Sequence, residues 1–157
     1  MMSTSQIDLI ENYNIWYYDA LMKIVENVPT YSLEMFRVEA ARFLTKQTVL
    51  DEPVSMPWGG RYVGIAGWEA MLTSDVRDVA MEFLSNIKFT EPTYYQKDNV
   101  VLRELSWTVA PTAIDPEPWV TWHIEKYWVE GDRIVRIDEY YQDTATLLKR
   151  MGMLSPS

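Results

Sequence analysis

Residues 48–64 read TVLDEPVSMPWGGRYVG, and this stretch decides the fold. A short run of β-branched and apolar residues reaches the acidic pair Asp51-Glu52 and breaks at Pro53. A loop rich in proline and glycine then leads to a helical pattern that begins near Ile65. A carboxylate at the end of a strand can point into the space between helices and a sheet, held there by the rigid strand behind it. Glu52 is therefore the first candidate for a functional residue.

Two helical patterns precede this stretch, and one follows it. Apolar residues recur at three- and four-residue steps over 7–28, with Ser5 as the cap and Pro29 as the end. A second pattern follows Ser32, and its apolar face carries Leu33, Phe36, Ala40, Phe43 and Leu44. The third helix is expected over 65–84, and its solvent-facing side carries Asp75, Arg77 and Asp78.

From Asn86 onward the apolar period changes to two, which is typical of strands. Short strands are expected near 87–89 and 94–95, longer ones over 100–109, 119–130 and 133–142, and a short helical turn in the tail. Helices followed by an antiparallel meander predict an α+β fold. We expect three N-terminal helices packed on a curved, mostly antiparallel sheet, as in a cone-shaped α+β barrel that encloses a pocket.

Length and composition narrow the classes of function. A chain of 157 residues fits a single domain over 1–157, and a net charge of -9 argues against a nucleic-acid or anionic-membrane partner. The chain has seven Trp, ten Tyr, one His and no Cys, which favours an aromatic pocket and makes a metal site improbable. No apolar run approaches the roughly 20 residues of a membrane span. We expect a cytoplasmic protein with a small hydrophobic substrate, no metal and no cofactor.

The strand over 119–130 has two faces that could each point inward. One face carries His123, Glu125, Tyr127 and Val129, and the other carries Trp122, Ile124, Lys126 and Trp128. In a simple sandwich the more apolar face points inward, so that the acids lie in water. In a cone with a polar cavity the acids point inward, and the face with Trp122, Ile124 and Trp128 becomes an outer patch. We favour the cone, which predicts a homodimer through that patch.

Several of these residues resemble the SnoaL-like branch of the nuclear transport factor 2-like (NTF2-like) superfamily. The resemblance rests on the order of elements, the Glu52-Pro53 strand end, the loop PWGGRYVG at 57–64 and the closing strand DRIVRIDEYYQD at 132–143. It implies one domain, divided into N-terminal helices 6–46, strand and loop 47–64, helix 65–84, meander sheet 85–142 and tail 143–157. The superfamily includes ketosteroid isomerases, limonene epoxide hydrolases and polyketide cyclases.

The resemblance also implies site residues. In ketosteroid isomerases the general base falls on Glu52, the protonated second acid falls on Glu125, and the donor tyrosine has its nearest match at Tyr17. The epoxide hydrolases and cyclases carry a cavity acid before an aromatic pair, which falls on Glu139. The hydrolases also need an Arg-x-Asp pair on the third strand, which Arg103-Glu104-Leu105 does not reproduce.

Strand parity alone singles out Glu139, whereas the inward placement of Glu125 and His123 follows mainly from the resemblance. Glu139 lies on the apolar face of its strand, whereas Arg136 and Asp138 share the other face as a solvated pair. His123 is either a hydrogen-bonded wall residue or a base, since its ordinary pKa lies near neutrality. We name as catalytic candidates Glu52, Glu139, Glu125, Tyr17 and His123. The expected substrate-binding residues are Trp58, Tyr62, Trp68, Tyr127 and Tyr141.

These groups are suited to general acid–base chemistry. Carboxylates that share an apolar pocket shift one another's pKa values, so that one acts as a base and another as a donor. The leading hypothesis is an isomerase or cyclase acting on a polyketide-, terpenoid- or steroid-like molecule. The alternatives are an epoxide hydrolase or dehydratase in the same pocket, and a noncatalytic ligand-binding or dimeric interaction module.

Overall fold

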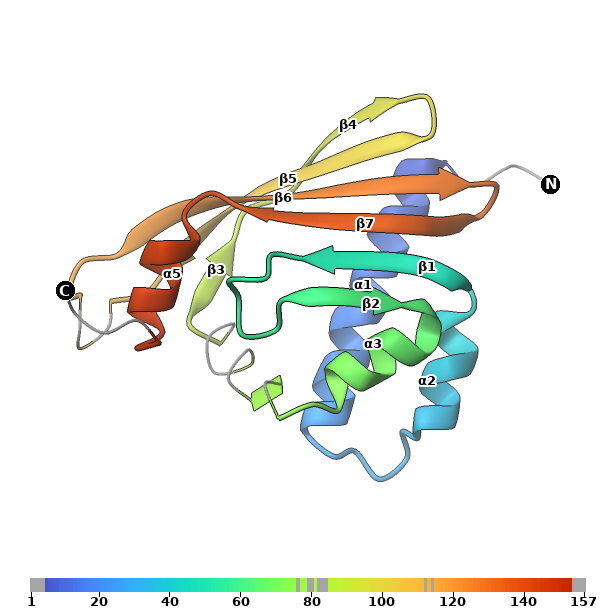
Figure 1. The fold of residues 1–157 in the computed structure, drawn as a ribbon, viewed down its shortest axis with the longest axis horizontal. Helices are drawn as coiled ribbons and strands as arrows, with labels where there is room; N and C mark the ends of the chain where they lie inside the picture. Colours follow the sequence, from blue (N-terminus) through green and yellow to red (C-terminus); the bar gives the residue numbers. More distant parts are fainter. Residues whose placement is uncertain are drawn as a thin grey trace.

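A curved seven-stranded sheet with helices on one face makes up the protein in the computed structural model (Figure 1). The structure describes residues 5–75, 77, 78, 81, 85–111, 113 and 115–153. The strands are β1 (Leu44–Glu52), β2 (Gly60–Val63), β3 (Ile87–Phe89), β4 (Thr93–Lys97), β5 (Val100–Val109), β6 (Trp119–Glu130) and β7 (Arg133–Tyr141). The helices are α1 (Gln6–Val25), α2 (Leu33–Ala40), α3 (Gly64–Leu72) and α5 (Thr144–Arg150).

The strand order is β2-β1-β7-β6-β5-β3, with β4 also paired to β5. Every pairing is antiparallel except that of β1 with β7. The sheet curves without closing, so its concave face and the helices enclose a cone-shaped interior. The predicted α+β cone with a mostly antiparallel sheet is confirmed.

The first two helices begin where the sequence predicts. Ser5 caps α1 in a capping box, in which its hydroxyl accepts from the Asp8 amide at 3.0 Å. Ser32 caps α2 through the Met35 amide at 3.2 Å. The first helix ends at Val25, before Pro29, because Asn27 adopts a positive φ of 51°.

Two predicted boundaries near β1 are wrong. Leu44 belongs to β1 and not to the second helix, so the strand starts four residues earlier than expected. The end of the proline- and glycine-rich loop also forms a strand, β2, whose Gly60 pairs with Glu52. Gly60 has a φ of 136°, and a Cβ on Gly59 would lie 2.1 Å from the Pro53 carbonyl oxygen. The two glycines thus allow the tight return that pairing with Glu52 requires.

The third helix is shorter than predicted. It ends at Leu72, where the Thr73 hydroxyl donates to the Glu69 carbonyl at 2.8 Å and the Ser74 hydroxyl donates to the Met71 carbonyl at 2.8 Å. These side chains compete with the backbone for the carbonyls that a longer helix would use. The parts of the expected helix at 76, 79, 80 and 82–84 lie outside the described residues.

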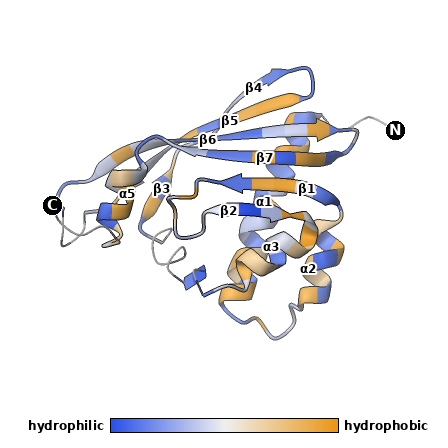
Figure 2. Cartoon of the chain, in the orientation of Figure 1, coloured by the Kyte–Doolittle hydropathy of each residue, from blue (hydrophilic) through white to orange (hydrophobic). Residues whose placement is uncertain are grey.

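Two apolar clusters flank the interior of the cone. The larger lies between the helices and the sheet and contains the fully buried Phe36, Trp68 and Tyr127. The smaller lies under α5 and joins Trp58, Trp107 and Leu147. Hydrophobic and hydrophilic stretches alternate along the strands of the sheet (Figure 2), as expected where one face is covered. Within the described residues, no helix has the length and apolarity to cross a membrane.

Candidate active site

The register of three neighbouring strands brings charged residues together. Arg103 on β5 pairs with Glu125 on β6, and Glu125 pairs with Glu139 on β7. Residues that are directly opposite in antiparallel strands place their side chains on the same face of the sheet. Arg103, Glu125 and Glu139 therefore form a row across the inner face.

A second row lies one step along the strands. His123 on β6 pairs with Leu105 on β5 and with Tyr141 on β7. The side chains of His123 and Glu125 are 6% and 5% exposed, and that of Glu139 is 12% exposed. The face of β6 that carries the acid and the histidine therefore points inward, as the cone interpretation predicted.

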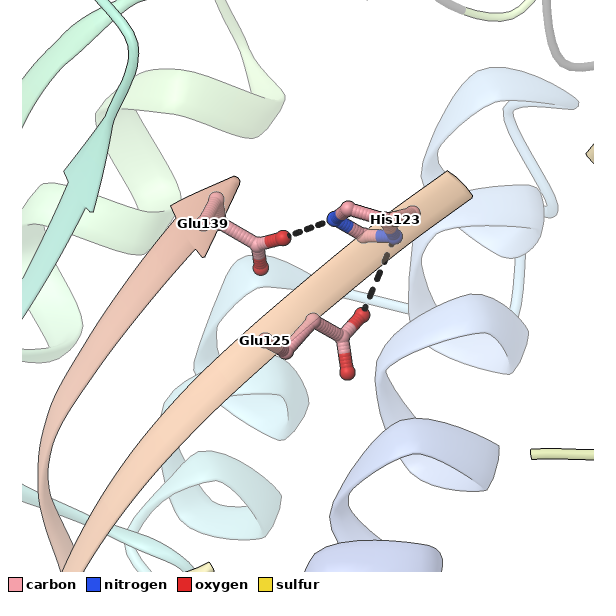
Figure 3. A group of neighbouring side chains, drawn as sticks. All are labelled: His123, Glu125 and Glu139. Carbon is pink, nitrogen blue, oxygen red and sulfur yellow. Dashed lines mark hydrogen bonds and ion pairs between the residues drawn. The ribbon is translucent and has the colours of Figure 1, made fainter. Parts of the chain in front are cut away.

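His123 lies between two carboxylates (Figure 3). Its Nε2 forms a short hydrogen bond with Oε2 of Glu139, and its Nδ1 lies 3.8 Å from Oε1 of Glu125. The Tyr141 ring stacks on the imidazole at 4.7 Å between centroids, and the Trp107 ring lies at 4.8 Å. The two aromatic rings fix the plane of the imidazole, so each nitrogen keeps its own carboxylate.

Glu125 is anchored on its far side. Its Oε2 accepts from Nη1 of Arg103 at 2.7 Å and from the Tyr127 hydroxyl at 2.7 Å. The Tyr127 hydroxyl also accepts from Asn14 on α1 at 3.0 Å, which ties the sheet to the first helix. Glu125 thus lies in an ion pair, whereas the resemblance implied a protonated hydrogen-bond donor at this position.

Glu52 lies at the end of β1, next to β7. Its Oε2 accepts from the Tyr141 hydroxyl at 3.2 Å, and the Trp58 indole donates to the same hydroxyl at 3.4 Å. Since the Tyr141 ring also stacks on His123, this tyrosine connects the two acid groups of the site.

These residues line a cavity of about 100 Å³. Its charged and histidine lining consists of Glu52, Arg77, His123, Glu125 and Glu139. Its aromatic lining consists of Tyr13, Tyr17, Tyr18, Trp58, Trp107, Tyr127 and Tyr141. The rest of the lining is Asn14, Leu21, Leu50, Met71 and Leu72.

Burial dominates the electrostatics of the cavity. It raises the pKa of Glu139 well above the ordinary value, and the charge of Glu125 adds to this shift. Burial and then Glu139 raise the pKa of Glu52, against the opposing influence of His123 and the Tyr141 hydrogen bond. Burial lowers the pKa of His123. These shifts favour a neutral imidazole and a proton on Glu139.

Comparisons by sequence find no relative, since no protein-family model and no curated protein matches the chain. Comparisons of structure do find similar folds. TerC, co-crystallised with polyporic acid, aligns with a TM-score of 0.55 and 12% identity over 87% of this chain and 98% of TerC.

An NTF2-like protein from Burkholderia xenovorans aligns with a TM-score of 0.52 and 16% identity, over 85% of this chain and 96% of its own. A second NTF2-like protein, of unknown function and from Burkholderia pseudomallei, aligns with a TM-score of 0.51 and 13% identity. The alignment covers 86% of this chain and 96% of that protein. The chain has the NTF2-like fold. The predicted resemblance to this superfamily is thereby confirmed at the level of the fold.

The NTF2-like cone places most of the predicted site residues on one cavity. Glu52, Glu125, Glu139, Tyr17 and His123 all line it, as do Trp58, Tyr127 and Tyr141. Two expected substrate-binding residues do not. Trp68 is fully buried and donates to the Tyr13 hydroxyl at 2.9 Å, and Tyr62 donates to the Trp58 carbonyl at 2.6 Å. Both support lining residues from behind.

Other residues of the NTF2-like cavity were missed or misplaced from the sequence. Arg103 is buried beside Glu125, and its burial could have been inferred from its place between Val101 and Leu105 on the inward face of β5. Arg77 was expected to face solvent, yet it lines the cavity with its side chain 24% exposed. The helical period carried no such signal, because α3 ends before this residue is reached.

His123, Glu125 and Glu139 are a histidine and two acids whose potential ligand atoms lie within 4.8 Å of one another. The two carboxylates face opposite nitrogens of one ring, so a cation bound at one nitrogen would have the ring between it and the other carboxylate. This arrangement suits proton transfer through the imidazole better than chelation.

Proposed function

We propose that the protein is an isomerase or cyclase that moves protons on a small hydrophobic carbonyl compound. The observation that carries the proposal is the position of His123, held between two buried carboxylates on the wall of an aromatic cavity that also contains Glu52. Burial and mutual repulsion shift the pKa values of such groups apart, so that one can act as the general base and another as the general acid.

The proposed reaction begins with removal of a proton from the carbon next to the carbonyl. The carboxylate of Glu52 takes this proton, and the electron pair of the C–H bond moves into an enolate. Tyr17 and Tyr18 face the cavity, and burial raises both of their pKa values, so they remain protonated donors for the enolate oxygen. The pair of Glu139 and His123 returns a proton at a second position, which completes an isomerisation or a ring closure.

Hydrogen exchange tests the proposal directly. Small cyclic ketones such as 2-tetralone are incubated with the protein in D₂O, and loss of the hydrogens next to the carbonyl is followed by NMR. The variants Glu52→Gln, Glu139→Gln and His123→Asn should each slow exchange by about 10²- to 10⁴-fold. Asp51→Asn and Asp138→Asn alter neighbouring acids that are ion-paired on the outer face, and should leave the rate within about twofold.

Other outcomes would support the alternative functions. A product that carries oxygen from H₂¹⁸O would point to hydrolysis or hydration. Binding without exchange, with ordinary pKa values for Glu52 and Glu139, would point to a noncatalytic pocket. Either result contradicts the proposal.

We also propose that two copies associate through the outer face of β6 and β7. Val120, Trp122 and Tyr140 are about half exposed on this face, with Ile124 and Trp128 partly buried beside them. Trp122→Glu should convert a dimer to a monomer in analytical ultracentrifugation, whereas Val38→Glu on exposed α2 should not. A wild-type monomer would contradict this proposal.

A further inference from the structure

Arg103 acts on one oxygen of Glu125 and leaves the other for His123. Its guanidinium is 10% exposed and donates to Oε2, which also accepts from Tyr127. Oε1 faces Nδ1 of the imidazole at 3.8 Å. This separation is too long for a hydrogen bond, so Glu125 acts on the ring through its field.

The positive charge of Arg103 is permanent. Arginine does not lose its proton in proteins, and the charge of Glu125 raises the pKa of Arg103 further against the opposing effect of burial. A carboxylate held by a fixed cation presents a negative oxygen to Nδ1. Such an oxygen favours a proton on the nitrogen that it faces.

The other nitrogen has a different neighbour. Nε2 shares a short hydrogen bond with Glu139, whose pKa is raised by burial and by Glu125. A protonated Glu139 donates this bond, and Nε2 then accepts it as an unprotonated nitrogen. A proton on Nδ1 and an accepting Nε2 describe the same tautomer, so the groups on both sides of the ring favour the same state.

We infer that Arg103 is a positioning residue: through Glu125 it holds His123 as the Nδ1–H tautomer, and Nε2 exchanges a proton with Glu139. The direction of proton transfer in the cavity is thereby set. In this tautomer only Nε2 has a lone pair in the plane of the ring, so the imidazole receives protons on the Glu139 side.

Among the residues that the structure describes, the other charged and titratable groups around the ring have partners other than Nδ1 or are kept neutral. Glu52 on β1 bonds to Tyr141, and Tyr13, Tyr17 and Tyr18 on α1 have raised pKa values that keep them neutral. Tyr127 bonds to Glu125, and Arg77 bonds to Asp78. The rings of Tyr141 and Trp107 pack against the imidazole and oppose a flip that would exchange its nitrogens.

The role of Arg103 in catalysis rests on the proposed function, but the tautomer is a property of the resting protein and can be measured without a substrate. His123 is the one histidine of the chain, so ¹⁵N-histidine labelling reports a single ring. Long-range ¹H–¹⁵N correlation at neutral pH distinguishes the two tautomers and the doubly protonated ring. We expect a protonated Nδ1 and an unprotonated Nε2, the reverse of the preference of histidine in water.

Variants locate the cause of the preference. Arg103→Met should lower the ratio of Nδ1–H to Nε2–H by at least about tenfold, which corresponds to about 1.4 kcal/mol. Arg103→Lys retains a cation and should retain most of the preference. Tyr127→Phe removes the other hydrogen bond to Oε2 but leaves the charge, and should not change the tautomer. If Arg103→Met does not fold, Glu125→Gln removes the same charge from the other side and should give the same shift.

An Nε2–H ring or a doubly protonated ring in the wild type would overturn the inference. So would a ratio that is unchanged in a folded Arg103→Met or Glu125→Gln protein. Hydrogen exchange without the expected tautomer would leave the proposed function standing and reject the role of Arg103. The expected tautomer without any hydrogen exchange would reject the proposed function and support the effect of Arg103 on the tautomer.

Discussion

Asp51 and Glu52 are adjacent residues of β1 with opposite environments. Asp51 points to the outer face, where Arg61 donates two hydrogen bonds to it at 2.7 and 2.9 Å and Arg136 donates a third at 2.9 Å. Glu52 points into the cavity, where it accepts a hydrogen bond from the Tyr141 hydroxyl. The pKa of Asp51 is lowered, chiefly by the bond from Arg61, whereas burial raises that of Glu52.

The same contrast separates the two faces of the sheet. On the outer face Asp51 and Asp138 are matched by Arg61 and Arg136. Among the described residues, the cavity holds Glu52, Glu125 and Glu139 around His123, and of these glutamates Glu125 is ion-paired with an arginine, Arg103. An arginine beside an exposed carboxylate lowers the pKa of that carboxylate, whereas burial without a cation raises it. Adjacent side chains on one strand can thus have a structural or a chemical role according to the face they occupy.

Loss of the buried cation should have the largest effect. Arg103→Met leaves Glu125 unpaired in the interior, and should lower the free energy of unfolding by about 3–5 kcal/mol. Arg61→Met removes an arginine whose side chain is 63% exposed, and should lower the free energy of unfolding by less than about 1 kcal/mol. Urea denaturation measures both. Similar losses in the two variants would remove the distinction between the faces.

Stability should depend on pH in opposite ways at positions 51 and 52. Because folding raises the pKa of Glu52, the stability it contributes is full below its unfolded value of about 4.3 and falls as pH rises through its folded pKa. Each pH unit between the unfolded and the folded pKa is worth about 1.4 kcal/mol, so the free energy of unfolding of Glu52→Gln should rise relative to that of the wild type as pH increases above about 4.3.

Asp51 provides the matched control. Its lowered pKa means that its contribution is present above its unfolded value of about 3.9 and is lost as pH falls. Asp51→Asn should therefore lower the free energy of unfolding by a few tenths of a kcal/mol at pH 7, and this decrease should become smaller toward pH 3. Urea denaturation across this range would contradict the account if both variants changed in the same direction.

A pair of adjacent tyrosines allows a finer test. Tyr141→Phe removes the hydrogen bond to Glu52 and should raise the pKa of that carboxyl further, by the equivalent of about 1 kcal/mol. Tyr140 points outward and donates to Asp138 at 3.4 Å, so Tyr140→Phe should leave Glu52 unchanged. NMR titration of labelled glutamate side chains distinguishes the two variants. An equal response of Glu52 to both would show that Tyr141 does not act on it.

Salt should have the smallest effect. In 1 M NaCl the Debye length is about 3 Å, so the attraction of Asp51 to exposed Arg61 and Arg136 weakens. The pKa of Asp51 should move a few tenths of a unit toward its ordinary value, and that of Glu52 should hardly move. The same titration at low and high salt measures this difference. A larger response from Glu52 would show that solvent reaches it freely.

The sequence predicted the direction of side chains better than their partners. The two-residue period of β6 predicted that His123 and Glu125 share a face. The family resemblance favoured turning that face toward a cavity, although the opposite face is the more apolar. The contact with Arg103 depends on the register between β5 and β6, which alternation along a single strand does not encode. The ion pair of Glu125 with Arg103 could therefore not be predicted, and the donor role of Glu125 was taken from the family resemblance alone.

The predicted helix and strand boundaries are wrong where turn-forming residues interrupt the apolar pattern. The run at 57–64 has the composition of a loop, yet Gly60 returns the chain against Glu52 and makes β2. The apolar pattern over 65–84 continues past Leu72, but Thr73 and Ser74 end the helix through hydrogen bonds to backbone carbonyls. Arg77 consequently faces the cavity, where a continuous helix would have turned it outward.

The most direct test of this account is a titration of ¹³C-labelled aspartate and glutamate side chains in the wild type and in Glu139→Gln. The account predicts that Asp51 titrates below its ordinary value and Glu52 well above it. It also predicts that the pKa of Glu52 falls when Glu139 loses its charge, because Glu139 is the next cause of the shift after burial. An ordinary pKa for Glu52 that does not change in Glu139→Gln would contradict the account, because the two acids would not then share a buried site.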